Sequence, residues 1–294
     1  MPRRQFGGVG MMIERPGIGL TIRSAPRWSA DGPHADRAVR FGQLYCTTTG
    51  IKECFAIQIA AAAPEHTGLG TGTQLGLAVA RGIAEMTHQS DTAACQLAPK
   101  VGRGLRSALG VHGFDRGGFL VEGGKNTDRS ISPLVARCDF PDDWHILLIT
   151  PRDLVGMHSQ DELQAFASLS RQAPDDHATE ALCRLVLLGI IPALVAHDLD
   201  SFGEAVYDFN RRAGALFKAA QGGIYADPRI ESIIKTIRLA GVTCVGQSSW
   251  GPTVFAIAQR ESLLDLQGGM RMLGVANEQM VLTKACKHGV VIGA

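Results

Sequence analysis

Hydrophobic residues alternate with small or polar ones in several short stretches of the first half of the chain. This period of two is typical of half-buried strands, and it occurs at residues 6–25, 55–59 and 119–121. The first stretch has a Gly-rich opening followed by Ile18, Leu20 and Ile22, so residues 6–25 are predicted to form a hairpin.

A helical period appears directly after the second strand. Leu75, Val79, Ile83 and Met86 recur every three or four residues, which predicts a helix. Further along, helices are predicted at 160–171, 178–198, 200–220, 229–240 and 261–273, and strands at 144–149, 243–246, 253–258, 278–283 and 289–292. The most apolar stretch, Ala181–His197, contains Arg184 and Pro192 and is too short for a bilayer, so we expect a buried helix.

A domain boundary is predicted near residue 140, where Pro141, Asp142 and Asp143 precede a strand. Strands and helices are mixed without strict alternation, which favours an α+β fold over a doubly wound sheet. We therefore expect two domains, residues 1–140 and 141–294.

Composition and charge exclude several classes of protein. Hydrophobic residues make up 45% and charged residues 19%, with a net charge of +1, so neither a nucleic-acid surface nor a membrane protein is expected. The seven cysteines are dispersed, with no zinc-type spacing, so no metal site is predicted. Arg3 and Arg4 precede no apolar run that would make a signal peptide, and we expect a cytoplasmic protein with reduced thiols.

One loop carries the candidate chemistry. Residues 64–74 place Gly68, Gly70 and Gly72 between a predicted strand and a predicted helix. Glycines let backbone N–H groups approach an anion, and the helix start adds its positive end. Thr71 and Thr73 supply hydroxyl donors, although either could instead cap the helix of a purely structural turn. A Walker A motif requires a Lys after its last Gly, and this loop has none. A dinucleotide-binding fingerprint lies in the first turn between a strand and a helix, whereas this loop lies far along the chain. The loop is therefore predicted to be a different kind of phosphate site.

The pattern Pro-x-x-x-Gly-Leu-Gly, here Pro64 with Gly68, Leu69 and Gly70, resembles the central motif of the GHMP kinase superfamily. Further blocks resemble its non-kinase branch, the β-ribofuranosylaminobenzene 5′-phosphate synthases; they are residues 7–10, 103–110, 117–119, 151–166 and 241–252. The resemblance implies a two-domain GHMP-kinase-like fold, with a ribosomal protein S5 domain 2-like N-terminal part and a ferredoxin-like C-terminal part.

The kinases of this superfamily carry a catalytic Asp several residues before a Gly pair. Here the matching stretch, residues 106–110, has no Asp, and Asp115 stands too close to Gly117. Without that base a kinase would be weak, so the resemblance favours the synthases. It implies transfer from 5-phosphoribosyl 1-diphosphate to 4-aminobenzoate or 4-hydroxybenzoate, with loss of CO₂ and diphosphate, in methanopterin-type biosynthesis. It also implies a homodimer, no organic cofactor, and Mg²⁺ accompanying the diphosphate.

The candidate site residues follow from the loop and the resemblance. Diphosphate or phosphate would be held by Gly68, Leu69, Gly70, Thr71, Gly72, Thr73 and Lys125. Arg103 and Arg106 could hold the 5-phosphate, the diphosphate or the benzoate carboxylate. The aromatic acceptor would lie against Gln247, Ser248, Ser249 and Trp250, with Arg106, His112 and Ser248 as the catalytic candidates. His158 and Glu162 form a weaker pair. A purely structural role also remains open for these residues, because the arginines could lie on the surface and Trp250 and His112 could belong to the core.

Three alternatives remain open: an ATP-dependent kinase of the same superfamily, a non-catalytic sugar-phosphate sensor, and a globular protein whose Gly-rich turns are only structural. Family members usually have a further strand before the segment that begins here at Phe6. We expect loss of that strand to expose a sheet edge.

Overall fold

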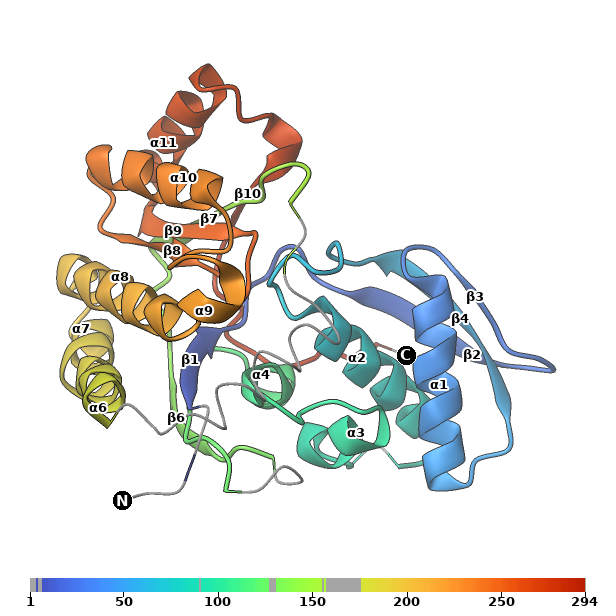
Figure 1. The fold of residues 1–294 in the computed structure, drawn as a ribbon. Coiled ribbons are helices and arrows are strands. Elements are labelled where there is room, and N and C mark those ends of the chain that lie inside the picture. The colour runs from blue at the N-terminus through green and yellow to red at the C-terminus, as the bar shows by residue number, and fades with distance from the viewer. Residues whose placement is uncertain are drawn as a thin grey trace. The chain divides into compact units, whose positions relative to one another are not determined.

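The computed structural model describes residues 4, 7–89, 91–126, 131–154, 156 and 176–293. The chain forms two compact units (Figure 1). Unit 1 contains Met1–Pro64, Gly70–Asp139 and Ala285–Ala294, and unit 2 contains Glu65–Leu69 and Phe140–Lys284. The sequence placed the boundary after residue 140, where the chain does enter unit 2. It gave no sign that the last ten residues return to unit 1, or that residues 65–69 group with unit 2.

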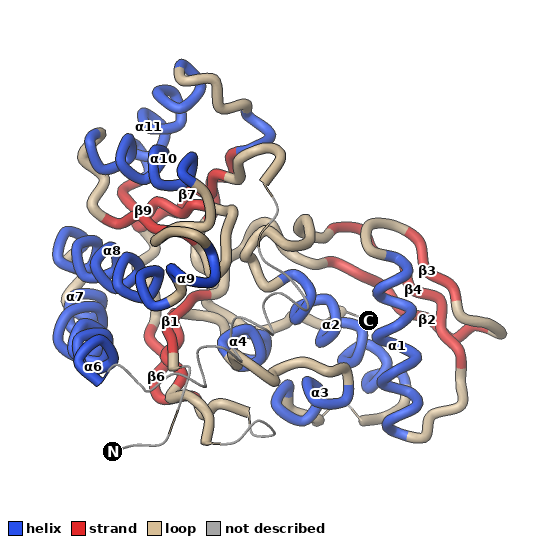
Figure 2. Tube along the Cα trace, in the orientation of Figure 1, coloured by secondary structure: helices blue, strands red, loops and turns tan. Residues whose placement is uncertain are grey.

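The first sheet of unit 1 has the order β2-β4-β3, with bounds Gly19–Ala25, Cys54–Ala61 and Ser29–Asp31. Strand β4 pairs antiparallel with β2 and parallel with β3. Helices α1 (Ala35–Thr49) and α2 (Thr71–Met86) lie side by side against this sheet (Figure 2). The alternating Phe55, Ile57 and Ile59 are buried, and they pack with the helical Leu75 and Ile83 as the two periods predict.

The second sheet of unit 1 has the order β1-β5-β6, with bounds Gly8–Met11, Phe119–Glu122 and Leu134–Cys138. Helix α4 (Leu109–Arg116) packs on β1 and β5, and α3 (Ala94–Lys100) packs on α2 and α4. The predicted hairpin at 6–25 is wrong, because β1 pairs with β5 whereas β2 pairs with β4. An alternating hydrophobic pattern indicates that a segment is a strand, but it does not indicate which other strand pairs with it.

The C-terminal segment is not a strand at 289–292, which corrects another prediction. It is held to unit 1 by single hydrogen bonds. Cys286 N–H donates to the Met12 carbonyl (2.8 Å), Gly118 N–H donates to the Cys286 carbonyl (2.7 Å), and Val290 N–H donates to the Phe114 carbonyl (2.7 Å).

Unit 2 is built on an antiparallel sheet of order β10-β7-β9-β8. In chain order the strands are β7 (Trp144–Ile149), β8 (Cys244–Gln247), β9 (Val254–Gln259) and β10 (Met280–Thr283). Helices separate β7 from β8 and β9 from β10, so chain order and strand order together give a ferredoxin-like sheet. The α+β class and the ferredoxin-like C-terminal part are confirmed.

Helices cover both faces of this sheet, which explains why β7 is a nearly continuous apolar run. On one face Leu147 and Ile149 pack with α10 (Pro228–Leu239) and α11 (Arg260–Met272). On the other, Trp144 contacts Phe202 of α8 (Leu199–Leu216) with ring centroids 5.2 Å apart. The short α9 (Lys218–Gln221) and the 3₁₀ turn Asn277–Gln279 complete the unit.

The apolar segment before α8 differs from its prediction. Helix α6 (Asp176–Leu185), the π-helical turn Val186–Ile190 and α7 (Ile191–Val195) form one helical stretch of 20 residues with a hydropathy of 1.9. By length and composition alone it could cross a membrane, although one such helix is weak evidence for a span. In an 18-residue window of this stretch only 17% is buried, and Leu187 and Leu188 are exposed, so the expectation of a buried helix is wrong.

Candidate active site

The Gly-rich loop leads into α2 through a left-handed glycine. Gly70 has φ 70° and is the N-cap, and its carbonyl accepts from the N–H groups of Thr73 (2.9 Å) and Gln74 (3.2 Å). Neither threonine caps the helix. The hydroxyl of buried Thr71 instead donates to the carbonyl of Pro64 (3.1 Å), so it fixes the loop rather than serving as a free donor. The backbone N–H groups of Thr71 and Gly72, at the first two positions of the helix, have no preceding turn to accept from them.

Arg103 reaches the first turn of α2, and its predicted contact with a substrate anion stays a prediction. A methyl group added at Gly72 would lie 3.2 Å from Nη2 of Arg103 and would collide with Nη2 of Arg37. Arg37 was missed because it comes from the first turn of α1, distant in the sequence and outside any motif. The only available signal was the spacing of Gly72 and Gly76, which leaves one side of α2 open to large side chains.

Arg106 lies in the same connection between α3 and α4 as Arg103. Residues 102–108 contain a turn and a bend and no helix, so the helical spacing that would put both arginines on one face does not apply. Its role stays a prediction.

Two buried charged residues hold this connection from the end of β5. The Glu122 carboxylate accepts from the hydroxyl of Ser107 (2.5 Å) and from the N–H of Ala108 (2.7 Å). The Lys125 ammonium donates to the carbonyl of Leu105. Lys125 is 7% exposed and Glu122 is 3% exposed. This contact lets Lys125 position the arginine-bearing loop, and the predicted contact of Lys125 with phosphate stays a prediction.

His112 is also engaged within unit 1. Its Nε2 lies 2.7 Å from the carbonyl of Ser132, and its Nδ1 lies 3.6 Å from the sulfur of Cys95. Burial, followed by the nearby Asp115 carboxylate, raises the pKa of the Cys95 thiol, so the pair is not a thiolate nucleophile with its base. These contacts hold the His112 ring in place, and its catalytic role stays a prediction.

Asp115 has a structural role as well. Its carboxylate accepts from the N–H of Ala94 at the start of α3 (2.8 Å) and pairs with Arg81 (3.4 Å). This agrees with the sequence argument that Asp115 does not replace the kinase base.

Residues 65–69 of the Gly-rich loop belong to unit 2, where they contact the second Gly-rich segment, residues 241–252. The Ser248 hydroxyl donates to the Gly68 carbonyl (2.8 Å), and the Ser248 carbonyl accepts from Gly251 N–H (2.8 Å). Gly156 N–H donates to the His66 carbonyl (2.8 Å). The hydroxyl of Ser248 thus holds Gly68, and the predicted catalytic role of Ser248 stays a prediction.

Gln247 and Trp250 are buried in unit 2. Gln247 Oε1 accepts from Ala226 N–H (2.7 Å), and its Nε2 donates to the Ser249 carbonyl (2.9 Å). Trp250 is 7% exposed and makes an edge contact with Phe217, with ring centroids 4.7 Å apart. Both side chains therefore shape the turn from within, and only Ser249 of the predicted acceptor site is exposed. His158 and Glu162 lie outside the described residues.

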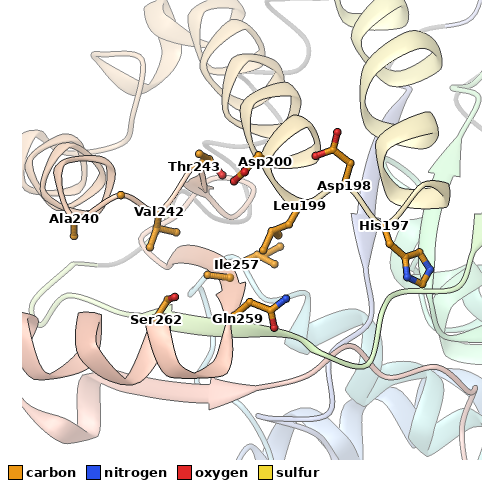
Figure 3. Close-up of a pocket in the computed structure, with 12 residues that line it drawn as sticks. His197, Asp198, Leu199, Asp200, Ala240, Val242, Thr243, Ile257, Gln259 and Ser262 are labelled. Atoms are coloured by element: carbon orange, nitrogen blue, oxygen red, sulfur yellow. The ribbon is translucent and has the colours of Figure 1, made fainter.

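A separate cavity of about 450 Å³ lies in unit 2 at the start of α8 (Figure 3). It is lined in part by His197, Asp198, Asp200 and Gln259, and its lining includes no Lys or Arg. Two aspartates make it unsuitable for a phosphorylated sugar, and it contains none of the predicted site residues. Over the described ranges, no group of three or more His, Cys, Asp or Glu side chains could hold a metal ion.

Comparison with known proteins agrees with the fold. Residues 190–266 match the family model of the GHMP kinase C-terminal domain. The homoserine kinase of Cytophaga hutchinsonii superposes with a TM-score of 0.67 at 17% identity, covering 96% of this chain and 90% of that one. The mevalonate pyrophosphate decarboxylase of Streptococcus pyogenes gives a TM-score of 0.68 at 10% identity, covering 99% and 90%. At these identities the likeness concerns the fold alone.

Sequence relatives define the family. A β-ribofuranosylphenol 5′-phosphate synthase of Archaeoglobus fulgidus is 34% identical over 86% of this chain and 80% of its own length. The synthase of the same name from Methanothermobacter thermautotrophicus is 30% identical over 88% and 83%. That from Methanocaldococcus jannaschii is 28% identical over 97% and 92%. The chain therefore belongs to the β-ribofuranosylphenol 5′-phosphate synthase family, a family of enzymes with the GHMP kinase fold.

Proposed function

We propose that this protein transfers the phosphoribosyl group of 5-phosphoribosyl 1-diphosphate to 4-hydroxybenzoate, with release of CO₂ and diphosphate, in methanopterin-type cofactor biosynthesis. The observation that carries the proposal is the 34% identity to a β-ribofuranosylphenol 5′-phosphate synthase. The word phenol in that name favours the hydroxy acceptor, because loss of CO₂ from 4-hydroxybenzoate leaves a phenol. The same reaction of 4-aminobenzoate leaves an aniline.

The proposed reaction balances without an added acid or base. The bond between the anomeric carbon and the diphosphate oxygen breaks, and its electron pair leaves with the diphosphate. The ring carbon that bears the carboxylate forms the new bond to the anomeric carbon. The carbon–carboxylate bond then breaks, its electron pair restores the aromatic ring, and CO₂ departs. Because no net proton transfer occurs, the absence of a kinase-type Asp before Gly117 is compatible with this chemistry.

The start of α2 supports the diphosphate end of the reaction. As the bond to the sugar breaks, negative charge grows on the departing diphosphate and must be stabilised. The backbone N–H groups of Thr71 and Gly72, the positive end of a 16-residue helix and the guanidinium of Arg103 all favour an anion there. Magnesium would enter with the diphosphate as part of the substrate, since Mg²⁺ is commonly held through substrate phosphates.

The remaining assignments are parts of the same proposal. We propose that Leu69 and Arg106 contact the phosphorylated sugar, and that Ser249 contacts the acceptor. A homodimer in the cytoplasm is the expected form of the enzyme.

The test is an acceptor and donor comparison with the purified protein. With 5-phosphoribosyl 1-diphosphate we expect CO₂ from carboxyl-labelled 4-hydroxybenzoate, at a higher kcat/KM than from 4-aminobenzoate. ATP should bind weakly and should not be hydrolysed. Tight ATP binding would favour the kinase alternative, and sugar-phosphate binding without CO₂ release would favour the sensor.

A further inference from the structure

The side-chain amide of Asn210 pairs with the last residue of the edge strand β8. Its Nδ2 donates to the carbonyl of Gln247 (2.8 Å), and its Oδ1 accepts from the N–H of the same residue (2.9 Å). Asn210 lies inside α8, although asparagine is a poor helix former. A methyl group added at Gly246 would lie 2.6 Å from the Cγ of Asn210, so this close approach requires a glycine there. Asn210 therefore does for Gln247 what a neighbouring strand would do.

The side chain of Gln247 holds the segment that follows β8. It is buried, its Oε1 accepts from the N–H of Ala226 (2.7 Å), and its Nε2 donates to the carbonyl of Ser249 (2.9 Å). A methyl group added at Gly251 would lie 3.1 Å from the Cδ of Gln247, so the chain closes tightly over this amide. Gln247 is thus fixed twice, because Asn210 holds its backbone while Ala226 and Ser249 hold its side chain.

Ser249 is the exposed residue of this segment, and its backbone is unusual. Its φ is 52°, in the left-handed region that residues other than glycine rarely adopt. The hydrogen bond from Gln247 to the Ser249 carbonyl holds the backbone there. The neighbouring Trp250 is buried, and the hydroxyl of Ser248 donates to Gly68, whereas Ser249 is exposed. Strained backbone that its surroundings hold in place is characteristic of functional sites, so this conformation points to a role for the Ser249 hydroxyl.

The chemistry of a serine hydroxyl favours the acceptor over the diphosphate. A hydroxyl is uncharged and both donates and accepts hydrogen bonds, which suits a small aromatic acid with a polar substituent. A diphosphate instead favours cations, with which it forms charge-assisted hydrogen bonds.

We infer that Asn210 and Gln247 are positioning residues that hold Ser249 in the conformation that binds the aromatic acceptor. The inference rests on the proposed function for the identity of that acceptor and for its contact with Ser249. It adds Asn210, from α8, to the residues on which acceptor binding depends. It also gives the buried Gln247 an indirect role, through Ser249, in place of direct contact with the acceptor.

The experiment is calorimetric titration with 4-hydroxybenzoate and with inorganic diphosphate, each as a separate ligand. For Asn210→Ala we expect 4-hydroxybenzoate to bind on the order of 10-fold more weakly, the size expected for the loss of one hydrogen bond. Ser249→Ala should weaken its binding to a similar extent. Both variants should bind diphosphate as the unaltered protein does, because the hydroxyl that they remove or misplace serves the acceptor.

A double variant separates positioning from general damage to the fold. If Asn210 acts through Ser249, the protein with both Asn210→Ala and Ser249→Ala should bind 4-hydroxybenzoate as weakly as Ser249→Ala alone. The reason is that the hydroxyl that Asn210 positions is already absent. Two independent effects would multiply instead, to a loss on the order of 100-fold.

Two further variants guard against a simple loss of folding. Asn210→Asp keeps the size of the side chain and the acceptor for the Gln247 N–H, but it places an oxygen against the Gln247 carbonyl. It should weaken 4-hydroxybenzoate binding while the unfolding transition remains cooperative. Gln279→Ala is the matched control, because Gln279 accepts from Ala276 N–H (3.0 Å) and donates to the Thr150 carbonyl (3.3 Å) beside β10, the opposite edge of the sheet. It should lower stability and leave both affinities unchanged.

Unchanged affinity for 4-hydroxybenzoate in Asn210→Ala would overturn the inference. So would an equal loss for both ligands, multiplied losses in the double variant, or no binding of 4-hydroxybenzoate to the unaltered protein. Because binding is measured without turnover, its result is independent of CO₂ release. Binding of 4-hydroxybenzoate that depends on Asn210 and Ser249, in a protein that releases no CO₂, would contradict the proposed function and leave the positioning roles standing.

Discussion

The hydroxyl of Ser248 donates a hydrogen bond to the carbonyl of Gly68 at 2.8 Å, across 180 residues of sequence. The two Gly-rich segments that the sequence singled out as separate motifs therefore meet within unit 2. The hydrogen bond between Ser248 and Gly68 gives part of each motif a role in the structure of the protein.

Ser248→Ala should remove this bond and little else. We expect the free energy of unfolding to fall by about 1 kcal/mol, measured by urea denaturation, with kcat within a few fold of the unaltered enzyme. Ser249→Ala, at the exposed neighbouring hydroxyl, is the control and should change stability by less than about 0.5 kcal/mol. A loss of kcat of about 100-fold or more in Ser248→Ala alone, the size expected for a catalytic group, would support the catalytic role.

Gly68 and Gly70 offer a matched pair in the same loop. Both have positive φ, at 80° and 70°, but a methyl group at Gly68 would collide with the Ser248 carbonyl, whereas one at Gly70 has open space. Gly70→Ala should cost about 1–2 kcal/mol for the left-handed backbone, and Gly68→Ala should cost clearly more. If urea denaturation gave equal losses of stability for Gly68→Ala and Gly70→Ala, the Ser248 carbonyl would not lie close to Gly68.

Glu122 tests the structure that positions the arginine-bearing loop. In Glu122→Gln an amide N–H₂ replaces one acceptor and faces a donor at Ser107 or Ala108, so we expect a loss of about 1–3 kcal/mol of stability. The KM for the diphosphate sugar should rise with it. The exposed Glu53→Gln should change neither quantity. A destabilised Glu122→Gln enzyme with an unchanged KM would show that the loop keeps its position without this carboxylate.

Asp227 should make α10 sensitive to acid. It is the N-cap, and hydrogen bonds from the Arg229 side chain and then its backbone N–H lower the pKa of the Asp227 carboxyl. Because the pKa of this carboxyl is lower in the folded than in the unfolded protein, it stabilises the fold at any pH above its pKa in the unfolded protein. This stabilisation is lost as the pH falls through the pKa of the folded protein. Asp227→Ala should cost about 1 kcal/mol at pH 7, and the difference should shrink toward zero in acid.

Asp227→Asn is the control for that titration, because asparagine caps a helix without a charge. It should retain most of the stability at pH 7 and should lack the acid dependence. A penalty for Asp227→Ala that is the same at neutral and acidic pH would contradict the assignment.

Much of the secondary structure could be predicted because local periods report local structure. The period of two marked β4, and the helical period marked α2, since Phe55, Ile57, Leu75 and Ile83 face one core. The same periods could not predict that β1 pairs with β5 or that residues 285–294 belong to unit 1, because those contacts join distant parts of the chain. Nor could hydropathy show that Leu187 and Leu188 are exposed.

The candidate site was predictable only where a motif marked it. The Gly-rich loop and Arg103 were proposed in this way. Arg37 carries no motif, and its approach to Gly72 exists only once α1 packs on α2. Lys125 and His112 looked available in the sequence, and only the folded chain shows their contacts with Leu105 and Ser132.

The synthase activity itself is tested most directly by stoichiometry. The purified protein, given 5-phosphoribosyl 1-diphosphate and carboxyl-labelled 4-hydroxybenzoate, should release CO₂ and diphosphate in a ratio of one to one, and neither substrate alone should release CO₂. Diphosphate released without CO₂ would indicate hydrolysis of the donor, and it would contradict the proposed transfer to the aromatic ring.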